Sequence, residues 1–274
     1  MTDHDSKIMA RLSEHLEAVK GVHPEWVGIF LQGSQNYNLD YEGSDIDSKL
    51  IVLPSFEDFV LNRKPYSYTH LMENDEHVDV KDIRLMFECF RKQNINFVEI
   101  LFTKYRILNP KYEKLFQPVL DARELIGRYN DFAALNCMVG MAMEKQNALC
   151  HPYPTIISKI ERFGYDPKQL HHILRLSEFM ARWLDNEPYA DCLISQEREY
   201  LKSVKFGAIP LEEAKELANA TVGSMQNIKK AYMDSHAATV NKEVENTMNT
   251  ALVELFKYNF MCEIGGDKNV PLAC

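Results

Sequence analysis

The chain has 274 residues, of which 46% are hydrophobic and 26% are charged, and its formal net charge is -9 at pH 7. That length suffices for one large or two modest domains with hydrophobic cores, and the composition is typical of a soluble globular protein. The acidic balance argues against a protein that coats nucleic acid, because such proteins normally carry a dominant basic patch.

Helical and strand patterns alternate over the first 110 residues. An apolar stripe with helical spacing opens the chain at Ile8, Leu12, Leu16 and Val19. Runs of β-branched and aliphatic residues then predict strands, and amphipathic spacing predicts further helices. In chain order, these are strands at 26–31 and 49–53, a helix at 56–63, strands at 66–72 and 77–80, and a helix from Asp82. We therefore predict a mixed α/β arrangement for residues 1–110.

Beyond residue 110 the strand signals thin out and helical spacing dominates. Four segments carry this spacing: residues 128–149, 167–184, 210–232 and 241–259. We predict an α+β protein, in which a mixed-sheet domain at residues 1–110 is followed by a helical bundle at residues 111–274.

A Gly-Ser pair, Gly33 and Ser34, directly follows the first predicted strand. We expect a helix to open here, so that its free backbone N–H groups and the positive end of its dipole attract a phosphate group. The hydroxyl of Ser34 adds a further hydrogen-bond donor.

Three aspartates follow the Gly-Ser pair on predicted strands. Asp45 and Asp47 alternate on one strand, so we expect both side chains on one face of the sheet. Asp79 follows on a later strand, between β-branched residues. Carboxylates that lie this close together repel each other, so a cation is needed between them. We therefore predict a site for two Mg²⁺ ions, with Mn²⁺ as the alternative ion, and for the triphosphate of an NTP.

The same stretch, DYEGSDID, is rich in oxygen ligands and raises the alternative of a calcium loop. The spacing excludes that alternative. If Asp40 is position 1, Asp45 stands where the loop needs glycine and Ile51 stands where it needs a bidentate glutamate. A zinc site is also disfavoured, because the histidines lack H-x-x-x-H spacing and the cysteines are not paired.

Five of these residues together resemble the signature of the DNA polymerase β superfamily of nucleotidyltransferases. That signature is G-S, a spacer, D-x-D and a distant third carboxylate, matched here by Gly33, Ser34, Asp45, Asp47 and Asp79. The resemblance implies a polymerase-β-like catalytic domain in the first half of the chain. It implies that Asp45 and Asp47 hold both metal ions and that Asp79 completes the metal that activates the acceptor hydroxyl. Ser34 would contact the β- and γ-phosphates.

Within the superfamily, the chain is most similar to a group of predicted nucleotidyltransferases from bacteria and phages. The group's motifs appear here as GSQNYN, SDID, DVK, KQNINFVEILF and KQLHHILRL. Three positions depart from the group: Asn38 and Gln93 each replace a glycine, and Ile95 replaces a proline. Asparagine tolerates left-handed backbone angles better than other non-glycine residues, so Asn38 should be accommodated. None of the departures removes a metal ligand.

The segment GYDPKQLHHILRL predicts a helix with Asp166 as its N-cap and Pro167 as its first residue. At about 100° per residue, Lys168, His172 and Arg175 fall on one face and match the group's K-x-x-x-H-x-x-R motif. We expect this face to bind the triphosphate, Arg175 most strongly through its fork of donors. The alternative is an exposed basic face without a ligand.

Simpler interpretations apply to each motif in isolation. An S-D-x-D alone is more often a solvated turn, and Asp79 alone suits an exposed strand residue. Asp75, Glu76 and Asp82 compete for the role of third ligand, although the first two lie in a turn-like segment and Asp82 lies at an expected helix cap. Lys81 shares a strand face with Asp79 and either contacts a phosphate or neutralises the carboxylates.

The resemblance predicts a metal-dependent nucleotidyltransferase that moves a nucleoside monophosphate from an NTP, ATP by default, to an acceptor and releases pyrophosphate. RNA, a protein and a small molecule all stay open as the acceptor, because this fold serves many acceptors. The alternative is a catalytically silent regulator that binds a nucleotide or a partner. A toxin-like nuclease in the helical half is disfavoured, since no Arg and His pair has suitable spacing.

We expect a cytoplasmic protein of the bacterial or phage group, without a membrane partner. No apolar run approaches the roughly 20 residues of a membrane span, and the N-terminal residues lack the basic end and apolar centre of a signal peptide. The six cysteines show no C-x-x-C pairing, so we interpret them as reduced thiols.

Overall fold

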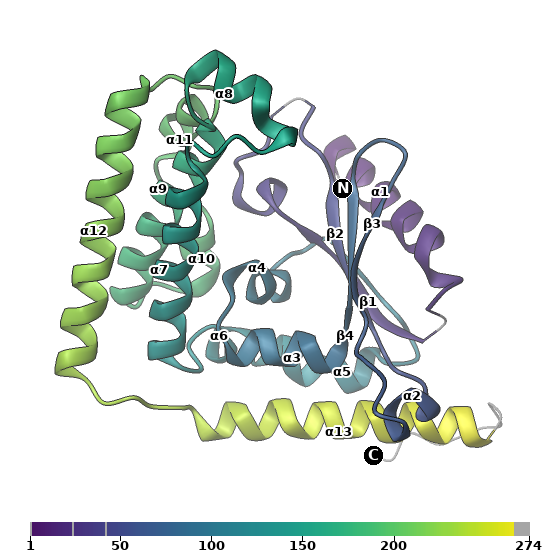
Figure 1. Cartoon of the computed structure of the whole chain (residues 1–274). Helices are drawn as coiled ribbons and strands as arrows, with labels where there is room; N and C mark the ends of the chain where they lie inside the picture. The colour runs from purple at the N-terminus through teal and green to yellow at the C-terminus, as the bar shows by residue number, and fades with distance from the viewer. Residues whose placement is uncertain (1, 24, 42, 266–274) are drawn as a thin grey trace. The chain divides into compact units, whose positions relative to one another are not determined.

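The computed structural model describes residues 2–23, 25–41 and 43–265. It confirms the predicted α+β class, because a mixed five-stranded sheet with helices is combined with a separate set of helices in the later part of the chain (Figure 1). In the described ranges, none of the helices has the length and apolar character that crossing a membrane requires.

Two compact units make up the chain. The first, here called the sheet unit, comprises residues 1–36, 41–129 and 241–274. The second, the helical unit, comprises residues 37–40 and 130–240. This division differs from the predicted boundary at residue 110, because the sheet unit includes three helices that follow that residue.

The sheet unit contains the five strands and most of the short helices. In chain order its elements are α1 (Asp3–Lys20), β1 (Trp26–Gln32), β2 (Asp47–Val52), α2 (Phe56–Val60), β3 (Ser67–Leu71), β4 (His77–Asp82), α3 (Ile83–Arg91), α4 (Ile95–Val98), the 3₁₀ helix η2 (Glu99–Leu101), β5 (Arg106–Leu108), α5 (Glu113–Asp121), α6 (Arg123–Ile126) and α13 (Lys242–Gly265). A further 3₁₀ helix, η1 (Ser34–Tyr37), bridges the first boundary between the units.

The strand order is β3-β4-β2-β1-β5. β2 pairs parallel with β4, whereas β1 pairs antiparallel with both β2 and β5, and β3 pairs antiparallel with β4. The four predicted strands are confirmed. β5 was not predicted, because a strand of three residues gives too short a pattern to detect.

Helix α1 covers one face of the sheet (Figure 1). Its apolar stripe packs against alternate residues of the strands, so that Leu12, Leu50 and Val80 belong to one buried core. Because side chains alternate along a strand, Lys49 and Asp79 project from the opposite face. The sheet thus has a mostly apolar face toward α1 and a face that carries charged side chains.

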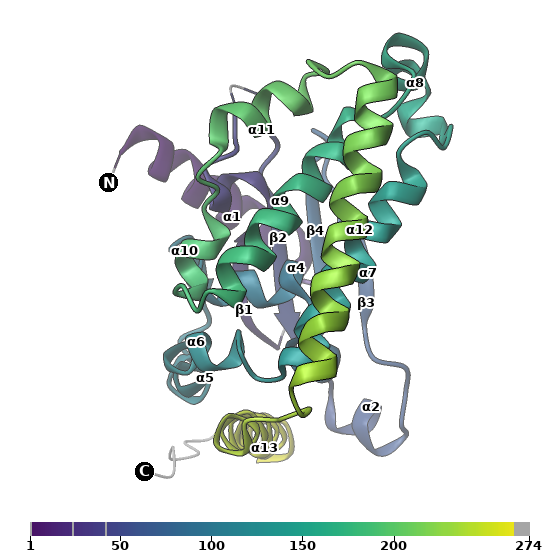
Figure 2. The ribbon, with the colours of Figure 1, turned by 90° about the vertical axis from the view of Figure 1, so that its left-hand side faces the viewer.

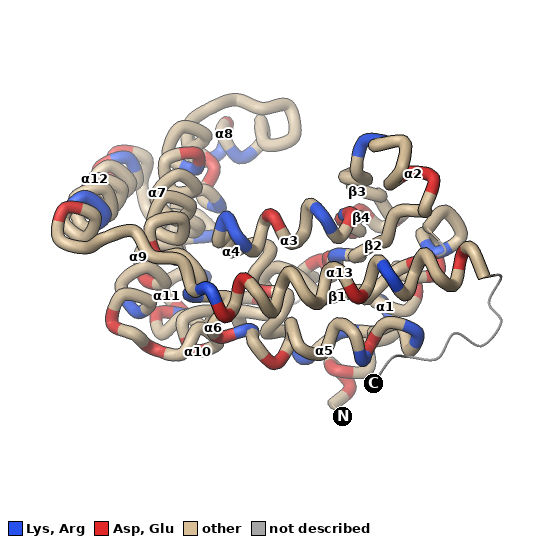
Figure 3. The backbone as a smooth tube through the Cα atoms, turned by 90° about the horizontal axis from the view of Figure 1, so that it is seen from below, with Lys and Arg blue, Asp and Glu red and all other residues tan. Residues whose placement is uncertain are grey.

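Helix α13 returns to the sheet unit, whereas the sequence placed it in the helical bundle. It packs against α5 and α3, and the carboxamide of Asn259 accepts a 2.7 Å hydrogen bond from Tyr112 and donates one of 2.9 Å to the carbonyl of Pro54. Figure 3 shows both Lys and Glu positions along α13. This helix therefore presents mixed charges rather than a basic stripe.

The helical unit contains α7 (Asp131–Ala148), the 3₁₀ helix η3 (Pro154–Ile156), α8 (Ile157–Phe163), α9 (Pro167–Leu184), α10 (Tyr189–Leu193), α11 (Arg198–Lys205) and α12 (Leu211–Ser235). The three long helices, α7, α9 and α12, pack against one another (Figure 2). α9 contributes the buried Phe179, Met180 and Trp183 to the core, and α10 and α11 pack on the same helix. The helical spacing of this part of the sequence therefore reflects a three-helix core centred on α9.

Among the described residues, Cys89, Cys137, Cys150, Cys192 and Cys262 are not joined in disulfides. Cys274 lies outside the described residues.

Replacing Leu12 with alanine should test the packing of α1 on the sheet. Leu12 is fully buried, so we expect Leu12→Ala to lower the free energy of unfolding by roughly 2–5 kcal/mol, measured by urea denaturation. Lys7→Ala, an exposed change on the same helix, is the control and should shift it by less than about 0.5 kcal/mol. Equal effects of the two changes would contradict the packing of α1.

Candidate functional site

The Gly-Ser pair forms a tight turn at the end of β1. Gly33 has a φ of 86°, a left-handed conformation that glycine adopts without cost. Ser34 begins η1, so the helix expected here is a single 3₁₀ turn. The register pairs Gln32 with Asp47, which places this turn beside the start of β2.

Two side chains hold the turn in place. Glu99, which is buried, accepts a hydrogen bond of 3.3 Å from the backbone N–H of Gly33. Asn36 donates to the carbonyl of Leu31 at 2.8 Å, and its Oδ1 accepts from the hydroxyl of Thr103 at 2.7 Å. Glu99 belongs to KQNINFVEILF, one of the segments that resemble the group of predicted nucleotidyltransferases. The structure shows that it orders the turn.

Asp47 is the first residue of β2, and Asp45 precedes the strand on an exposed segment. The prediction that both lie on one strand is therefore wrong for Asp45. The reason is that β1 stops pairing at Gln32, opposite Asp47, so no strand is available to pair with Asp45. Asp47 Oδ1 accepts a 2.9 Å hydrogen bond from the backbone N–H of His77 and lies 3.2 Å from that ring's Nδ1.

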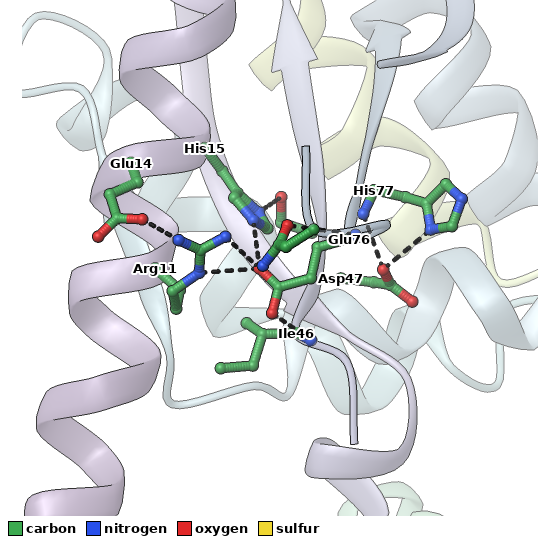
Figure 4. Close-up of polar contacts among 9 residues, drawn as sticks. Arg11, Glu14, His15, Ile46, Asp47, Glu76 and His77 are labelled. Carbon is green, nitrogen blue, oxygen red and sulfur yellow. Dashed lines mark hydrogen bonds and ion pairs between the residues drawn. The ribbon is translucent and has the colours of Figure 1, made fainter. Parts of the chain in front are cut away.

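A buried polar network fixes the backbone between the two aspartates (Figure 4). Glu76 Oε1 accepts from the N–H of Ile46 at 3.2 Å, while Oε2 accepts from Arg11 Nε at 2.8 Å and lies 3.1 Å from His15 Nε2. The other ring nitrogen of His15 lies 2.9 Å from the hydroxyl of Ser48, which is fully buried. Glu76 therefore ties α1 to the backbone of Ile46, and His15 ties α1 to Ser48.

Burial sets the protonation states in this network. Desolvation lowers the pKa of His15, so its neutral form donates to Glu76 and accepts from Ser48. Burial alone would raise the pKa of Glu76, but the hydrogen bonds from Asn74, Arg11 and His15 lower it overall. The sequence contained a signal for this network, because His15 interrupts an otherwise apolar helical stripe.

The competitors of Asp79 have other roles. Glu76 is committed to the network with Arg11 and His15. Asp75 lies in a turn with a φ of 65°. Asp82 caps α3, as predicted, by accepting from the N–H of Arg84 at 2.9 Å. Asp79 is therefore the carboxylate of this region that remains on the charged face of the sheet.

Asp79 forms an ion pair with Lys49, which the sequence analysis overlooked. The parallel register places Lys49 opposite Asp79, and the Nζ to Oδ2 distance is 2.7 Å. Lys49 is 4% exposed, and its ammonium lies 4.2 Å from the centroid of the Phe97 ring. Burial lowers the pKa of Lys49, and Asp79 opposes that shift. Lys81 lies over the same ring at 4.8 Å and donates to the hydroxyl of Ser67 at 3.0 Å.

The contacts of the three aspartates determine which of them can serve as ligands for the two predicted metal ions. Asp47 offers a carboxylate beside the Gly33 turn, and the exposed Asp45, two residues earlier, is the further carboxylate that could bind one Mg²⁺ together with phosphates. Asp79 does not fit a second ion in this structure, because Lys49 already neutralises it. Across residues 2–23, 25–41 and 43–265, no three His, Cys, Asp or Glu side chains are grouped as a metal site.

Three predicted residues lie on α9, in the helical unit. Asp166 caps this helix and Pro167 is its first residue, as predicted. Lys168 is exposed, but Arg175 is 7% exposed, and its guanidinium lies 4.1 Å from the centroid of the Tyr37 ring. The alternative of a fully exposed basic face is therefore wrong for Arg175.

The two histidines of α9 are kept neutral. Desolvation and the nearby Arg175 lower the pKa of His172 well below its usual value. Desolvation lowers the pKa of the buried His171 to about 4, and its Nδ1 lies 2.9 Å from the carbonyl of Leu201. His172 can therefore serve as a hydrogen-bonding group but not as a permanent cation.

The departures from the family pattern have a structural basis. Asn38 and Gln93 have φ values of 56° and 55°, in the left-handed region that glycine adopts most readily. The prediction that Asn38 is accommodated is confirmed. Gln93 is buried, and its amide donates to the carbonyls of Phe90 and Ile126, both at 2.7 Å.

Comparison with solved structures gives a distant likeness. No family model and no curated protein match the sequence. Among solved structures, the chain is similar to a nucleotidyltransferase-like protein from Exiguobacterium sibiricum, with 11% sequence identity and a TM-score of 0.29. The match covers 96% of this chain and 81% of that chain. A likeness of this degree does not assign a function.

Removing the carboxylate of Glu76 should destabilise the sheet unit. Glu76→Ala leaves Arg11 and the N–H of Ile46 without their buried partner, so we expect a loss of roughly 3–5 kcal/mol in the free energy of unfolding. Glu14→Ala is the matched control, because Glu14 contacts the same arginine on the exposed side. It should change the free energy by less than about 1 kcal/mol. Chemical denaturation of the two variants measures the difference.

The pKa of His171 predicts a loss of stability in mild acid. Below about pH 6.5 the unfolded chain binds a proton at His171, whereas the folded chain does so only near pH 4. Stability should therefore fall as the pH is lowered through this window, with roughly 3 kcal/mol from this residue. His171→Gln cannot bind that proton and should lose less. Parallel pH profiles of unfolding for both proteins would contradict the assignment.

Proposed function

We propose that this chain is a nucleotidyltransferase that moves a nucleoside monophosphate from an NTP to an acceptor and releases pyrophosphate. The observation that carries the proposal is the pairing of Gln32 with Asp47. It brings the Gly33 turn, a place for phosphate groups, next to the carboxylate that begins β2. A phosphate-binding turn beside an acidic strand end is the arrangement that a magnesium-bound triphosphate requires.

Each residue of the site has a distinct role in this proposal. Gly33 shapes the phosphate-binding turn, because its own N–H is donated to Glu99, and the hydroxyl of Ser34 binds the β- and γ-phosphates. Asp45 and Asp47 would hold Mg²⁺, or Mn²⁺, which supplies positive charge to the pyrophosphate leaving group. Lys81 adds a cationic group on the same face of the sheet as Asp47.

The reaction is an in-line displacement at the α-phosphorus. The acceptor hydroxyl oxygen forms a bond to this phosphorus, and the bond to the oxygen that bridges to the β-phosphate breaks. Pyrophosphate leaves with that oxygen, and the hydroxyl proton passes to solvent. The ordered turn contributes by holding the triphosphate in one orientation, since Glu99 and Asn36 fix its backbone.

We assign nucleotide contacts in the helical unit to Lys168, His172 and Arg175. Arg175 is the strongest candidate, because stacking on Tyr37 holds its planar group in one orientation before a ligand binds. His172 would act as a neutral hydrogen-bonding group, and Lys168 as an exposed charge.

The fold class indicates an NTP as one substrate but does not specify the acceptor. ATP is the default NTP, and RNA, a protein or a small molecule is the acceptor. Incubation of the purified chain with Mg²⁺, each α-labelled NTP in turn and a bacterial extract would identify both. The fraction of the extract that retains label gives the class of the acceptor.

One observation favours a second candidate function. The pairing of Asp79 with Lys49 removes a carboxylate from the predicted catalytic set, as expected for a regulator that binds a nucleotide without turnover. The two candidates differ in one measurement. A nucleotidyltransferase releases pyrophosphate, whereas a silent regulator binds the NTP and returns it unchanged.

Asp47→Asn should lower pyrophosphate release at least about 100-fold, because the triphosphate loses its metal-bound charge compensation. Asp75→Asn is the control. Asp75 lies in an exposed turn with a positive φ that asparagine tolerates, so its rate should stay within about twofold of wild type. A wild-type rate in Asp47→Asn would remove Asp47 from the site.

A further inference from the structure

Lys49, on the charged face of the sheet, is cationic and almost fully buried. It lies on β2, two residues after Asp47, so both side chains project from the same face. The parallel register sets it directly opposite Asp79 on β4. Strand pairing therefore fixes the backbone positions of the two partners.

Two contacts hold the ammonium group of Lys49 where it is. Its Nζ lies 2.7 Å from Asp79 Oδ2, a distance typical of a charge-assisted hydrogen bond. The Phe97 ring covers it at 4.2 Å, which adds a cation–π attraction. A buried amine is costly without such partners, so the ion pair accounts for the placement of Lys49 inside the protein.

The ion pair also changes what Asp79 can bind. The ammonium group of Lys49 already lies 2.7 Å from Asp79 Oδ2. A divalent cation bound to the same carboxylate would lie close to this ammonium group, and the two positive charges would repel each other strongly. Lys81, over the same Phe97 ring, adds a second positive charge nearby. This end of the charged face is therefore already cationic.

We propose that Lys49 takes the place of one of two metal ions, so that the site holds a single divalent cation on Asp45 and Asp47. Lys49 supplies the positive charge on the Asp79 side of the site. This inference rests on the proposed function, because it concerns the same substrate site. It departs from the two-metal arrangement that the sequence predicted.

Binding of Mn²⁺ alone to the full chain tests the inference without turnover. Titration followed by electron paramagnetic resonance counts the ions and gives their affinity. We expect one Mn²⁺ per chain, a loss of affinity of at least tenfold in Asp47→Asn, and an affinity within about twofold of wild type in Asp79→Asn. Lys49→Met should release Asp79 as a ligand and raise either the affinity, at least about tenfold, or the number of ions to two.

A control variant without either charge distinguishes an effect on metal binding from a loss of folding. Asp79→Asn leaves a buried lysine unpaired, so the double variant Lys49→Met/Asp79→Asn removes both charges together. It should bind one Mn²⁺ with the wild-type affinity. Two ions on the wild type, no ion on the wild type, or equal weakening by Asp47→Asn and Asp79→Asn would each overturn the inference.

The inference and the proposed function fail in different ways. Two Mn²⁺ ions per chain together with pyrophosphate release would overturn the inference and leave the proposed function in place. One Mn²⁺ per chain without pyrophosphate release from any NTP would support the charge substitution and count against transfer activity.

Discussion

A single buried carboxylate, that of Glu76, joins the three segments on which the candidate site is built. The carboxylate accepts hydrogen bonds from the side chain of Arg11 in α1 and from the backbone N–H of Ile46. The next residue in the chain, His77, donates its backbone N–H to Asp47. The ends of β2 and β4 are therefore set by polar contacts as well as by the sheet. Because every donor in this network is buried or partly buried, the loss of one partner leaves others unsatisfied.

The two faces of the sheet have different roles: one forms the hydrophobic core with α1, and the other carries the charged side chains of the candidate site. On the α1 face, Leu50 and Val52 of β2 and Val78 and Val80 of β4 are aliphatic and fully buried, and Ser48 is buried against His15. On the other face the same strands carry Asp47, Lys49, Asp79 and Lys81. The aliphatic and the charged side chains lie on opposite faces because successive side chains of a strand alternate between the two faces. Changes in the charged set can therefore alter binding while the apolar core stays intact.

Charge compensation on the charged face comes from the protein itself. Lys49 neutralises Asp79, and the backbone and ring of His77 partly compensate Asp47. Asp45 is exposed to solvent. The carboxylates are thus not equivalent, although the sequence motif presents them as one set. Their different environments are the basis for assigning one cation, rather than two, to this site.

The sequence by itself determined the features that depend on neighbouring residues. It predicted the strands from the runs of aliphatic residues, the start of α9 from Asp166 and Pro167, and the left-handed backbone that Asn38 accommodates. The burial of His15 was also detectable, because it interrupts an apolar stripe. These properties follow from backbone preferences and side-chain periodicity, which act within a few residues of the chain.

Only the tertiary structure decided which distant residues meet. Lys49 and Asp79 are 30 positions apart, and His15 and Glu76 are 61 positions apart. The burial of Arg175 against Tyr37 and the return of α13 to the sheet unit were likewise beyond the sequence pattern. The physical reason is that periodicity says which face of a strand or helix a side chain occupies. It does not say which strand pairs with it, and that pairing determines whether a carboxylate meets a metal ion or a lysine.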